Sequence, residues 1–388
     1  MKIIYFTTAQ REDDFRSFIN DWKISLNPSN QNFHNKLIRA LAVNNEVHVI
    51  SVRPFSRSNM KVSKLDKAVK MDGKITWHYV KRSGNKFYRA FVTTSQIMST
   101  LRGIDTTDSI FITDTINRAL VEAVYKIKKK YKRPVLGVCT DSPSNISGTT
   151  RSYTLFLLKH TKDYDGYLAL TDSLNMLFNP EGKPSYIFEG LVEDKMLKVE
   201  EAKKPYIFFG GALMEKYGVY NLIEAYKQLD KKDIELWICG HHGNIHKLTE
   251  AVGDNKNIKL LGLLPVAKVM EYEQASLCTV NPRPFSEDLD RFSIPSKTLE
   301  YMAMGRPVIS VRNTILMNKF PSELVWIPSS SVSDIKAGLE KVLAMTEVER
   351  ENFGEEAKNR VLALYSIKSV GNNIQHFLLN FLKQDITD

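Results

Sequence analysis

The segment from Phe292 to Ile309, FSIPSKTLEYMAMGRPVI, combines residue types that can hold a phosphorylated ligand. Pro295 suits the first turn of a helix, because its missing N–H would have no partner there. Ser293 or Ser296 is expected to cap that turn. Gly305 is expected to end the helix, and Pro307-Val-Ile to start a strand.

The start of this helix predicts a binding site for a nucleotide. Ser296, Lys297 and Thr298 would flank free backbone N–H groups, and such a helix end binds phosphate. Glu300 follows about one turn later, where a carboxylate can accept hydrogen bonds from ribose hydroxyls. Diphosphate and ribose together are the part of a sugar nucleotide that this pattern would hold.

The rest of the chain predicts two α/β domains. Strand-like runs alternate with amphipathic stretches such as Asn32–Val43 and Asn117–Lys130, which is typical of parallel sheets with helices on both faces. The first series of expected strands is Lys2–Thr7, Val47–Ser51, Ile75–Val80, Ser109–Ile112, Val135–Cys139, Tyr167–Leu170 and Ser185–Phe188. The second is Tyr206–Phe209, Glu235–Cys239, Ile258–Leu261, Leu277–Val280, Val308–Val311 and Leu324–Ile327.

The 292–309 segment resembles the donor site of glycosyltransferase family 4, whose fold is GT-B. Glu300 matches the final, ribose-binding Glu of the E-x7-E pattern of that family, whereas Phe292 stands where the first Glu would be. The sequence is closer to the branch F-x-P-S-K-x-x-E-Y-M-A-x-G-x-P-V-I, common among bacterial polysaccharide and capsule transferases. The resemblance implies two Rossmann-like domains with parallel sheets facing across a cleft.

The resemblance also implies donor-binding residues at other strand ends. Gly210 and Gly211 follow a strand and let the backbone approach a phosphate closely. The Arg and Lys that clamp the diphosphate in the family are replaced by Ala212 and Tyr217, with Lys216 one place away. The full set of expected donor-binding residues is Gly210, Gly211, Lys216, His241, Leu263, Arg283, Ser293, Pro295, Ser296, Lys297, Thr298 and Glu300.

The acceptor side is expected in the N-terminal half. The amide-rich stretch Asn30, Gln31, Asn32 precedes the first long helix, in place of the glycine-rich loop of the family, and its side chains suit acceptor hydroxyls. Asp141 follows the strand Val135–Cys139 near the position of a family His. We therefore expect Asp141 and Glu300 to be the catalytic residues, and Asp141 also to contact the acceptor.

Domain boundaries follow from the polar, charged stretch Glu193–Lys204. We expect an acceptor-binding domain over 1–195, a nucleotide-sugar domain over 205–365, and a terminal helix over 366–388. The resemblance implies that this helix crosses back onto the N-terminal domain; a dimer contact is the alternative.

Charge is concentrated in the N-terminal half. Residues 1–203 contain 32 Lys and Arg against 21 Asp and Glu, while the whole chain carries a net charge of +10. The densest cluster runs from Lys126 to Arg133 and suits an anionic membrane surface or a solvated helix end. Nucleic acid is disfavoured because no nucleic-acid motif appears.

No apolar run reaches transmembrane length, and the three cysteines fit reduced core thiols. We therefore expect a cytoplasmic protein at the inner face of the plasma membrane.

The expected reaction is hexosyl transfer with retention from a nucleoside diphosphate sugar, by resemblance UDP-hexose, to a lipid-linked saccharide. No metal or other cofactor is expected: Asp163-Tyr-Asp165 precedes a strand rather than following one, and His242 and His246 have no clear third ligand. Two alternatives remain open, a non-catalytic GT-B subunit that stabilises a partner transferase and a sugar-nucleotide epimerase.

Overall fold

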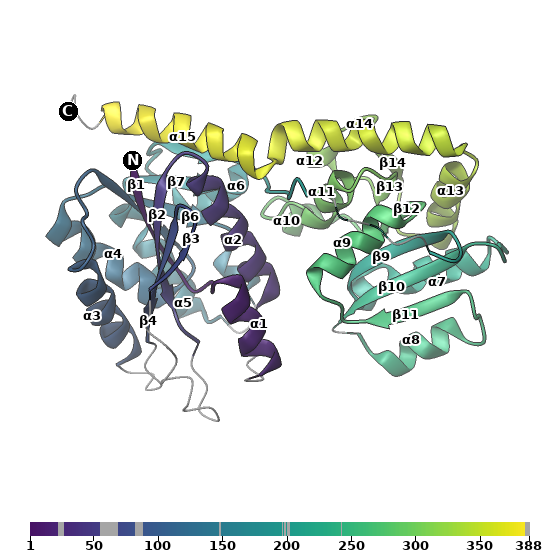
Figure 1. Ribbon diagram of the computed structural model, residues 1–388, viewed down its shortest axis with the longest axis horizontal. Helices are drawn as coiled ribbons and strands as arrows, with labels where there is room; N and C mark the ends of the chain where they lie inside the picture. The colour runs from purple at the N-terminus through teal and green to yellow at the C-terminus, as the bar shows by residue number, and fades with distance from the viewer. Residues whose placement is uncertain are drawn as a thin grey trace. The chain divides into compact units, whose positions relative to one another are not determined.

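The computed structural model describes residues 1–21, 27–54, 69–81, 88–146, 149–195, 197, 199, 202–241 and 243–384 (Figure 1). The chain forms two compact units. The N-terminal unit comprises 1–191, 291–293 and 367–388, and the C-terminal unit comprises 192–290 and 294–366.

The N-terminal unit contains an eight-stranded sheet in the order β3-β4-β2-β1-β5-β6-β7-β8. All neighbours are parallel except the β3–β4 pair. Its strands are β1 (Lys2–Thr7), β2 (Glu46–Val52), β3 (Lys70–Asp72), β4 (Ile75–Val80), β5 (Ser109–Asp114), β6 (Val135–Cys139), β7 (Gly166–Ala169) and β8 (Ser185–Ile187).

Helices cover both faces of this sheet, and alternate residues of each strand enter different cores. In β1, Ile3 and Tyr5 pack with α2 and α15, whereas Ile4 and Phe6 pack with α3, α4 and α6. The helices of the unit are α1 (Glu12–Asn20), α2 (Pro28–Ala42), α3 (Arg89–Leu101), α4 (Arg118–Tyr131), α5 (Arg151–Lys159), α6 (Asp172–Phe178) and α15 (Ile367–Gln384).

The terminal helix α15 is part of the N-terminal unit, although it follows the C-terminal unit in sequence. Val370, Ile374, Leu378 and Phe381 lie on one face of it and are buried in the core that α2 shares. The amide of Asn45 donates to Gln375 Oε1 at 2.8 Å, which adds a polar contact to the same face. The helix is amphipathic because its apolar residues recur every three or four positions.

The C-terminal unit contains a six-stranded, all-parallel sheet in the order β11-β10-β9-β12-β13-β14. Its strands are β9 (Tyr206–Ala212), β10 (Glu235–His241), β11 (Ile258–Gly262), β12 (Cys278–Asn281), β13 (Val308–Val311) and β14 (Val325–Ile327). Its helices are α7 (Val219–Lys227), α8 (Ile245–Val252), α9 (Val266–Ala275), α10 (Glu287–Asp290), α11 (Ser296–Ala303), α12 (Thr314–Met317), α13 (Val332–Leu343) and α14 (Glu347–Tyr365).

The expected fold class and the expected strands are confirmed. Two strands that should border the site are longer than predicted: β9 runs on to Ala212 and β10 to His241. The glycines Gly210 and Gly211 therefore lie inside a strand and not in the loop after it. Cys139, Cys239 and Cys278 are free and buried, as expected.

Each sheet has one position where the strand order reverses, between β1 and β5 in the first unit and between β9 and β12 in the second. Ligands of open α/β sheets bind beyond the carboxyl ends of the strands at such a switch point. The two switch points therefore indicate where functional residues of each unit should be sought.

Candidate active site

The switch point of the C-terminal unit is built on closely approaching glycines. Gly211 of β9 pairs with Gly240 of β10, and a Cβ added at Gly240 would lie 1.7 Å from the Gly211 carbonyl oxygen. Gly240 also has a φ of +149°, which side chains rarely tolerate. Gly218 has a φ of +76°, and its Cβ would lie 2.4 Å from the Pro282 carbonyl oxygen. Glycine is therefore required at positions 218 and 240 because neighbouring backbone leaves no room for a Cβ; Gly218 is buried, and Gly211 and Gly240 are half-buried.

Tyr301 of α11 fixes the end of β9. The Gly210 N–H donates to Tyr301 Oη at 2.9 Å, and the Tyr301 hydroxyl donates to the Gly210 carbonyl at 2.9 Å. The strand β12 pairs with β9 only as far as Phe208, so the hydroxyl takes the place of the missing strand partner two residues later. Burial raises the pKa of Tyr301, which keeps the hydroxyl protonated and able to donate.

The start of α11 differs from the expected cap. Pro295 is the N-cap residue, and no side-chain hydrogen bond caps the helix, so the expected cap by Ser293 or Ser296 is wrong. Ser296 is exposed at the first helical position. Ser293 is grouped with the N-terminal unit, whereas residues 294–366 belong to the C-terminal one. The neighbouring Phe292 packs against the N-terminal core.

Thr298 faces the sheet. Its side chain is fully buried, and its hydroxyl accepts a hydrogen bond from Asn281 Nδ2 at 2.8 Å. Asn281 ends β12, so this bond joins α11 to the second strand of the switch point. Thr298 therefore positions the helix. Its hydroxyl can still donate a hydrogen bond, but its side chain is fully buried, so the expected contact with a donor phosphate stays a prediction.

Lys297 lies between two carboxylates. Its Nζ is 3.6 Å from Glu300 Oε2 and 3.8 Å from Glu273 Oε1. Glu273, on α9, is buried, whereas the Lys297 and Glu300 side chains are 43% and 27% exposed. Burial alone would lower the pKa of Lys297, but Glu300 and Glu273 outweigh it and raise this pKa. The three groups together carry a net negative charge, with Glu300 the carboxylate closer to solvent.

Arg283 is engaged in shaping the loop after β12. Its Nη2 donates to Asp290 Oδ1 at 2.7 Å, and the Ser286 N–H donates to Asp290 Oδ2 at 2.8 Å. Asp290 is buried, so breaking this pair would leave an uncompensated buried charge. The pair with Asp290 fixes the guanidinium, so Arg283, which is 26% exposed, can offer its remaining N–H groups to a ligand only from that position.

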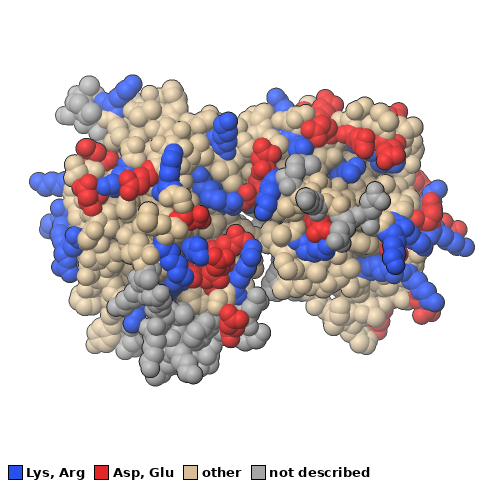
Figure 2. Space-filling view, viewed as in Figure 1, with Lys and Arg blue, Asp and Glu red and all other residues tan. Residues whose placement is uncertain are grey.

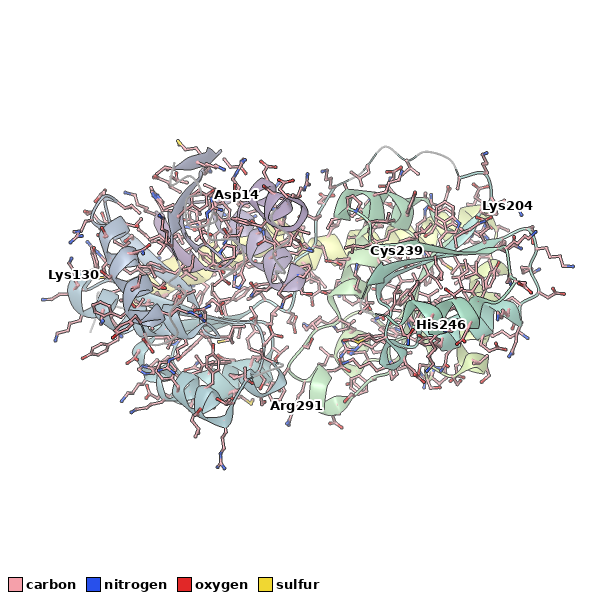
Figure 3. The ribbon with its side chains drawn as sticks, turned by 90° about the horizontal axis from the view of Figure 1, so that it is seen from below. Asp14, Lys130, Lys204, Cys239, His246 and Arg291 are labelled. Atoms are coloured by element: carbon pink, nitrogen blue, oxygen red, sulfur yellow. The ribbon has the colours of Figure 1, made fainter. Side chains whose placement is uncertain are left out.

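The other expected donor residues have these surroundings. Lys216 is exposed, with its ammonium 5.2 Å from the ring centroid of Tyr217. Leu263 follows Gly262 at the end of β11 and is 70% exposed. His241 ends β10, beyond the Cys239 labelled in Figure 3, and its side chain lies outside the described part of the chain.

In the N-terminal unit the amide-rich stretch is helical and not a loop. Asn27 caps α2 by accepting from the N–H groups of Ser29 and Asn30, so Asn30, Gln31 and Asn32 lie in its first turns. Gln31 is buried, and its amide bonds the backbone of Gln10 in both directions. The expectation that Gln31 binds an acceptor stays a prediction; in this structure its amide oxygen and nitrogen both have backbone partners. Asn30 is half-buried and Asn32 exposed.

Asp141 follows β6 and is exposed, yet the protein around its carboxyl removes enough water to raise its pKa. Behind it lies a buried polar group that sequence reasoning did not assemble. His34 Nδ1 is 2.6 Å from the Tyr5 hydroxyl, and His34 Nε2 is 3.7 Å from Asp114 Oδ2. All three residues are buried at the β1–β5 switch point. Asp114 ends β5, and such a strand-end position could have indicated it from the sequence, whereas no sequence pattern indicates Tyr5 or His34.

Burial sets the charge states of this group. It lowers the pKa of His34 to about 3 and raises that of Asp114 to about 7. The Ile116 N–H opposes the second shift, while Asp141 adds to it. At neutral pH His34 is consequently neutral, and Asp114 is poised to exchange a proton.

Of the residues considered for metal binding, Asp163 and Asp165 have other partners, and His242 lies outside the described residues. Asp163 contacts His160, and Asp165 contacts Lys128 and the Val135 N–H. Within the described ranges no group of three or more His, Cys, Asp and Glu side chains has a geometry for a metal ion.

The basic cluster lies on and after α4. Lys128 is held by Asp165, whereas Lys126, Lys129, Lys130 and Lys132 are exposed. Lys130 lies at the outer edge of this unit (Figure 3), where Lys and Arg side chains gather on the surface (Figure 2). Exposed aromatic rings accompany these cations: Phe91 is 65% and Tyr125 56% exposed, and the Lys126 ammonium lies 5.6 Å from the Phe91 ring centroid. None of the described helices is both long and apolar enough to span a membrane.

Residues 193–360 match the family model described as glycosyl transferases group 1. This segment includes the switch point with Gly210, Arg283, Lys297 and Glu300. Over this segment the C-terminal unit is therefore similar to the glycosyl transferases group 1 family, and the two α/β units have the GT-B fold.

Solved structures share the fold across both units. Sucrose-phosphate synthase (tll1590) from Thermosynechococcus elongatus aligns with a TM-score of 0.68 at 12% identity, covering 99% of this chain and 100% of that one. HepE from Anabaena in complex with UDP aligns with a TM-score of 0.65 at 12% identity, covering 98% and 100%. The α,α-trehalose 6-phosphate synthase from Burkholderia multivorans aligns with a TM-score of 0.65 at 11% identity, covering 100% and 98%. No curated protein sequence matches the chain significantly.

Proposed function

We propose that this protein is a retaining hexosyltransferase that takes its sugar from a nucleoside diphosphate donor bound at the β9–β12 switch point. The observation that carries the proposal is the arrangement there: glycine backbone held by Tyr301, with Glu300 and Lys297 on the adjoining helix. All of these residues lie within the segment that matches the group 1 family. UDP is the nucleotide that we favour, because HepE, which shares the fold, was solved with UDP.

The donor would be held through two chemically different groups. Backbone N–H groups at the start of α11, which no side chain caps, suit the diphosphate. Glu300, whose carboxylate is partly exposed, would accept hydrogen bonds from the ribose hydroxyls. Because Lys297 is shared by two carboxylates, its charge would reach the diphosphate only in part. The remaining stabilisation of the leaving group would come from the helix end and from Arg283.

We propose a front-face mechanism. The bond between the anomeric carbon and the diphosphate oxygen breaks, the acceptor oxygen bonds to the same face of that carbon, and the departing diphosphate takes the acceptor proton. The protein would supply positioning and charge stabilisation, with Asp141 orienting the acceptor hydroxyl.

Donor binding gives the decisive test. A ligand that binds only the folded state raises the unfolding midpoint, so UDP and a panel of UDP-hexoses should do so for the full chain. Glu300→Gln should weaken UDP binding by about 1.5–3 kcal/mol, the range for hydrogen bonds to a charged group. Glu340→Gln removes the same charge from α13 and should leave UDP binding unchanged. Equal UDP affinity in both variants and the original protein would exclude Glu300 as the ribose ligand.

The proposed acceptor is a lipid-linked saccharide at an anionic membrane surface. The surface formed by Phe91, Tyr125, Lys126 and Lys130 supports this, because cations attract anionic headgroups while aromatic rings suit the interface. Each Lys near such a surface contributes about 1 kcal/mol. Replacing Lys126 and Lys130 by Glu should therefore weaken binding to phosphatidylserine vesicles by at least about 2 kcal/mol, or roughly thirtyfold.

The matched control replaces Lys231 and Lys232, exposed on the C-terminal unit, by Glu. An equal loss in both double variants would show that net charge, and not this surface, governs the attraction. Binding that is stronger to DNA than to vesicles would contradict the membrane proposal.

Two competing functions make different predictions. A non-catalytic subunit would bind UDP-hexose but would neither hydrolyse it nor transfer its sugar to any acceptor tested. An epimerase would convert the donor sugar without any acceptor. Product analysis of a purified reaction with and without a saccharide acceptor therefore separates both from a transferase.

A further inference from the structure

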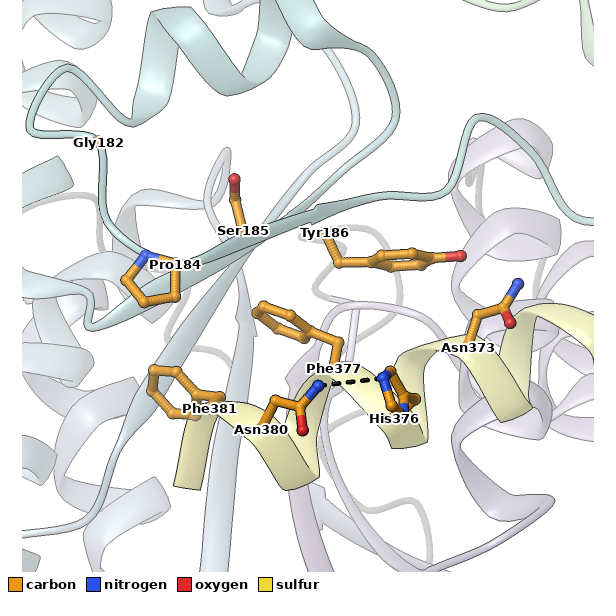
Figure 4. Close-up of a pocket in the computed structure, with 9 residues that line it drawn as sticks. All are labelled: Gly182, Pro184, Ser185, Tyr186, Asn373, His376, Phe377, Asn380 and Phe381. Atoms are coloured by element: carbon orange, nitrogen blue, oxygen red, sulfur yellow. Dashed lines mark hydrogen bonds between the residues drawn. The ribbon is translucent and has the colours of Figure 1, made fainter. Parts of the chain in front are cut away.

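An open pocket of about 600 Å³ lies on the N-terminal unit, between the edge strand β8 and the terminal helix α15 (Figure 4). This volume is within the usual range for small-molecule sites. The strand contributes Ser185 and Tyr186, and the helix contributes Asn373, His376, Phe377 and Asn380. None of the residues expected to bind the donor or acceptor lines it.

The lining is partly polar and partly apolar, and among the described residues it includes no Lys, Arg, Asp or Glu. A phosphate or nucleotide would find no fixed charge there to pair with. The polar side chains are instead amides, an imidazole and a hydroxyl, which can donate as well as accept hydrogen bonds. Such a set of side chains suits a ligand rich in hydroxyl groups, because each hydroxyl can also both donate and accept a hydrogen bond.

Aromatic rings form the apolar part of the pocket. The rings of Tyr186 and Phe377 are inclined by 28° with centroids 6.1 Å apart, and those of Phe377 and Phe381 by 25° at 6.1 Å. The faces of such rings carry negative charge density and attract the polarised C–H groups of a flat ligand. A pyranose ring offers these C–H groups on its faces and hydroxyls around its edge.

The pocket is already formed in the protein without a ligand. Phe381 is only 4% exposed and belongs to the core of the unit. Asn380 Nδ2 lies 3.1 Å from His376 Nε2, so these two side chains hold each other in place (Figure 4). Side chains held in this way lose less conformational entropy when a ligand binds.

We propose that this pocket binds a segment of a neutral saccharide. This proposal depends on the proposed function in one respect, the origin of the saccharide. The saccharide would be the acceptor chain or the growing product, bound away from the donor residues. A hydrocarbon chain fits less well, because it would cover the polar groups of Asn373, His376 and Asn380 without bonding them.

The test is a binding measurement on the full chain without donor. Maltotetraose, cellotetraose and triacetylchitotriose are titrated in the millimolar range and followed by saturation-transfer NMR. At least one should bind, with the strongest saturation on the C–H protons of one sugar-ring face. Asn380→Ala and His376→Ala, both exposed helix positions, should each weaken binding about tenfold, and Tyr186→Leu should abolish the ring-face pattern.

Asn372→Ala is the matched control, because Asn372 is exposed on the same helix but bonds Asn44 outside the pocket. It should leave binding unchanged. The proposal is overturned if none of the three saccharides binds, if the Asn380 and His376 variants bind as tightly as the original protein, or if the pocket variants alter only self-association. UDP binding measured on the same variants should be unaffected, so failure of the saccharide site and failure of the donor site give different results.

Discussion

Replacing Tyr301 by Phe removes one hydroxyl that bonds both polar groups of the Gly210 peptide. The rest of the buried side chain is kept, so no cavity larger than a hydroxyl forms. In a parallel sheet the N–H and C=O of one residue point to the same side, and β12 no longer pairs with β9 at Gly210. Phenylalanine would therefore leave a buried donor and a buried acceptor without their partner.

The expected cost follows from these two bonds. A typical intramolecular hydrogen bond contributes about 1 kcal/mol, and an orphaned buried group costs about 1–3 kcal/mol. We expect Tyr301→Phe to lower the unfolding free energy of the C-terminal unit by about 2–3 kcal/mol. A unit of this size loses about 2–4 °C of unfolding midpoint per kcal/mol, so the midpoint should fall by roughly 4–12 °C.

The assay is thermal unfolding together with UDP titration, and Tyr226→Phe is the control. Tyr226 is buried in the same unit, but its hydroxyl makes a single bond, to the Ile234 carbonyl at 2.6 Å. The control should cost about 1 kcal/mol and leave UDP binding intact, whereas Tyr301→Phe should also weaken UDP binding because the end of β9 is released. A cost for Tyr301→Phe no larger than that of Tyr226→Phe, with unchanged UDP affinity, would refute the reasoning.

Three further outcomes are expected. Gly240→Ala should destabilise the C-terminal unit by at least about 3 kcal/mol, because it adds backbone strain to an overlap with the Gly211 carbonyl. Gly262→Ala, with open space around its Cβ, should cost only the backbone strain. Equal unfolding midpoints for the two variants would contradict the predicted overlap. Lys297→Met should weaken UDP binding and lower the unfolding midpoint, since it removes the cation that lies 3.8 Å from the buried Glu273 carboxylate. A raised midpoint would mean that the pair is net destabilising. Asp114→Asn should change the pH dependence of stability, because a carboxyl whose pKa is about 7 when folded stabilises the fold at low pH and loses that contribution as pH rises from about 4 to about 7. Over that interval the variant should gain stability relative to the original protein, by at most about 1.4 kcal/mol per pH unit in urea unfolding. A constant difference in unfolding free energy would show that Asp114 does not titrate there.

Much of the fold could be predicted because buried parallel strands leave a local signature. Runs such as Lys2–Thr7 and Val308–Val311 are apolar on both faces, since each face meets its own layer of helices. Predicted and observed bounds agree there. They differ at β9 and β10, where the strands continue through glycines that local sequence patterns read as loops.

The candidate site was predictable only in part. The contact between Glu300 and Lys297 could be predicted because residues three apart on a helix face the same side; their roles in donor binding stay predictions. The bonds between Gln31 and the Gln10 backbone could not be predicted, because the two residues are 21 positions apart in sequence. Glu273 was missed for the same reason: its contact with Lys297 exists only after α9 and α11 have packed on the sheet.

The sequence by itself determined the two α/β units and the helix that carries Glu300, because strand burial and helix periodicity are local properties of the chain. Only the tertiary structure decided which polar atoms remain available for a ligand. Tyr301 bonds Gly210, Thr298 bonds Asn281, and His34 reaches Tyr5 across long separations in sequence. A buried polar group must hydrogen-bond to whichever group packing places beside it, and the residues next to it in sequence do not determine which group that is.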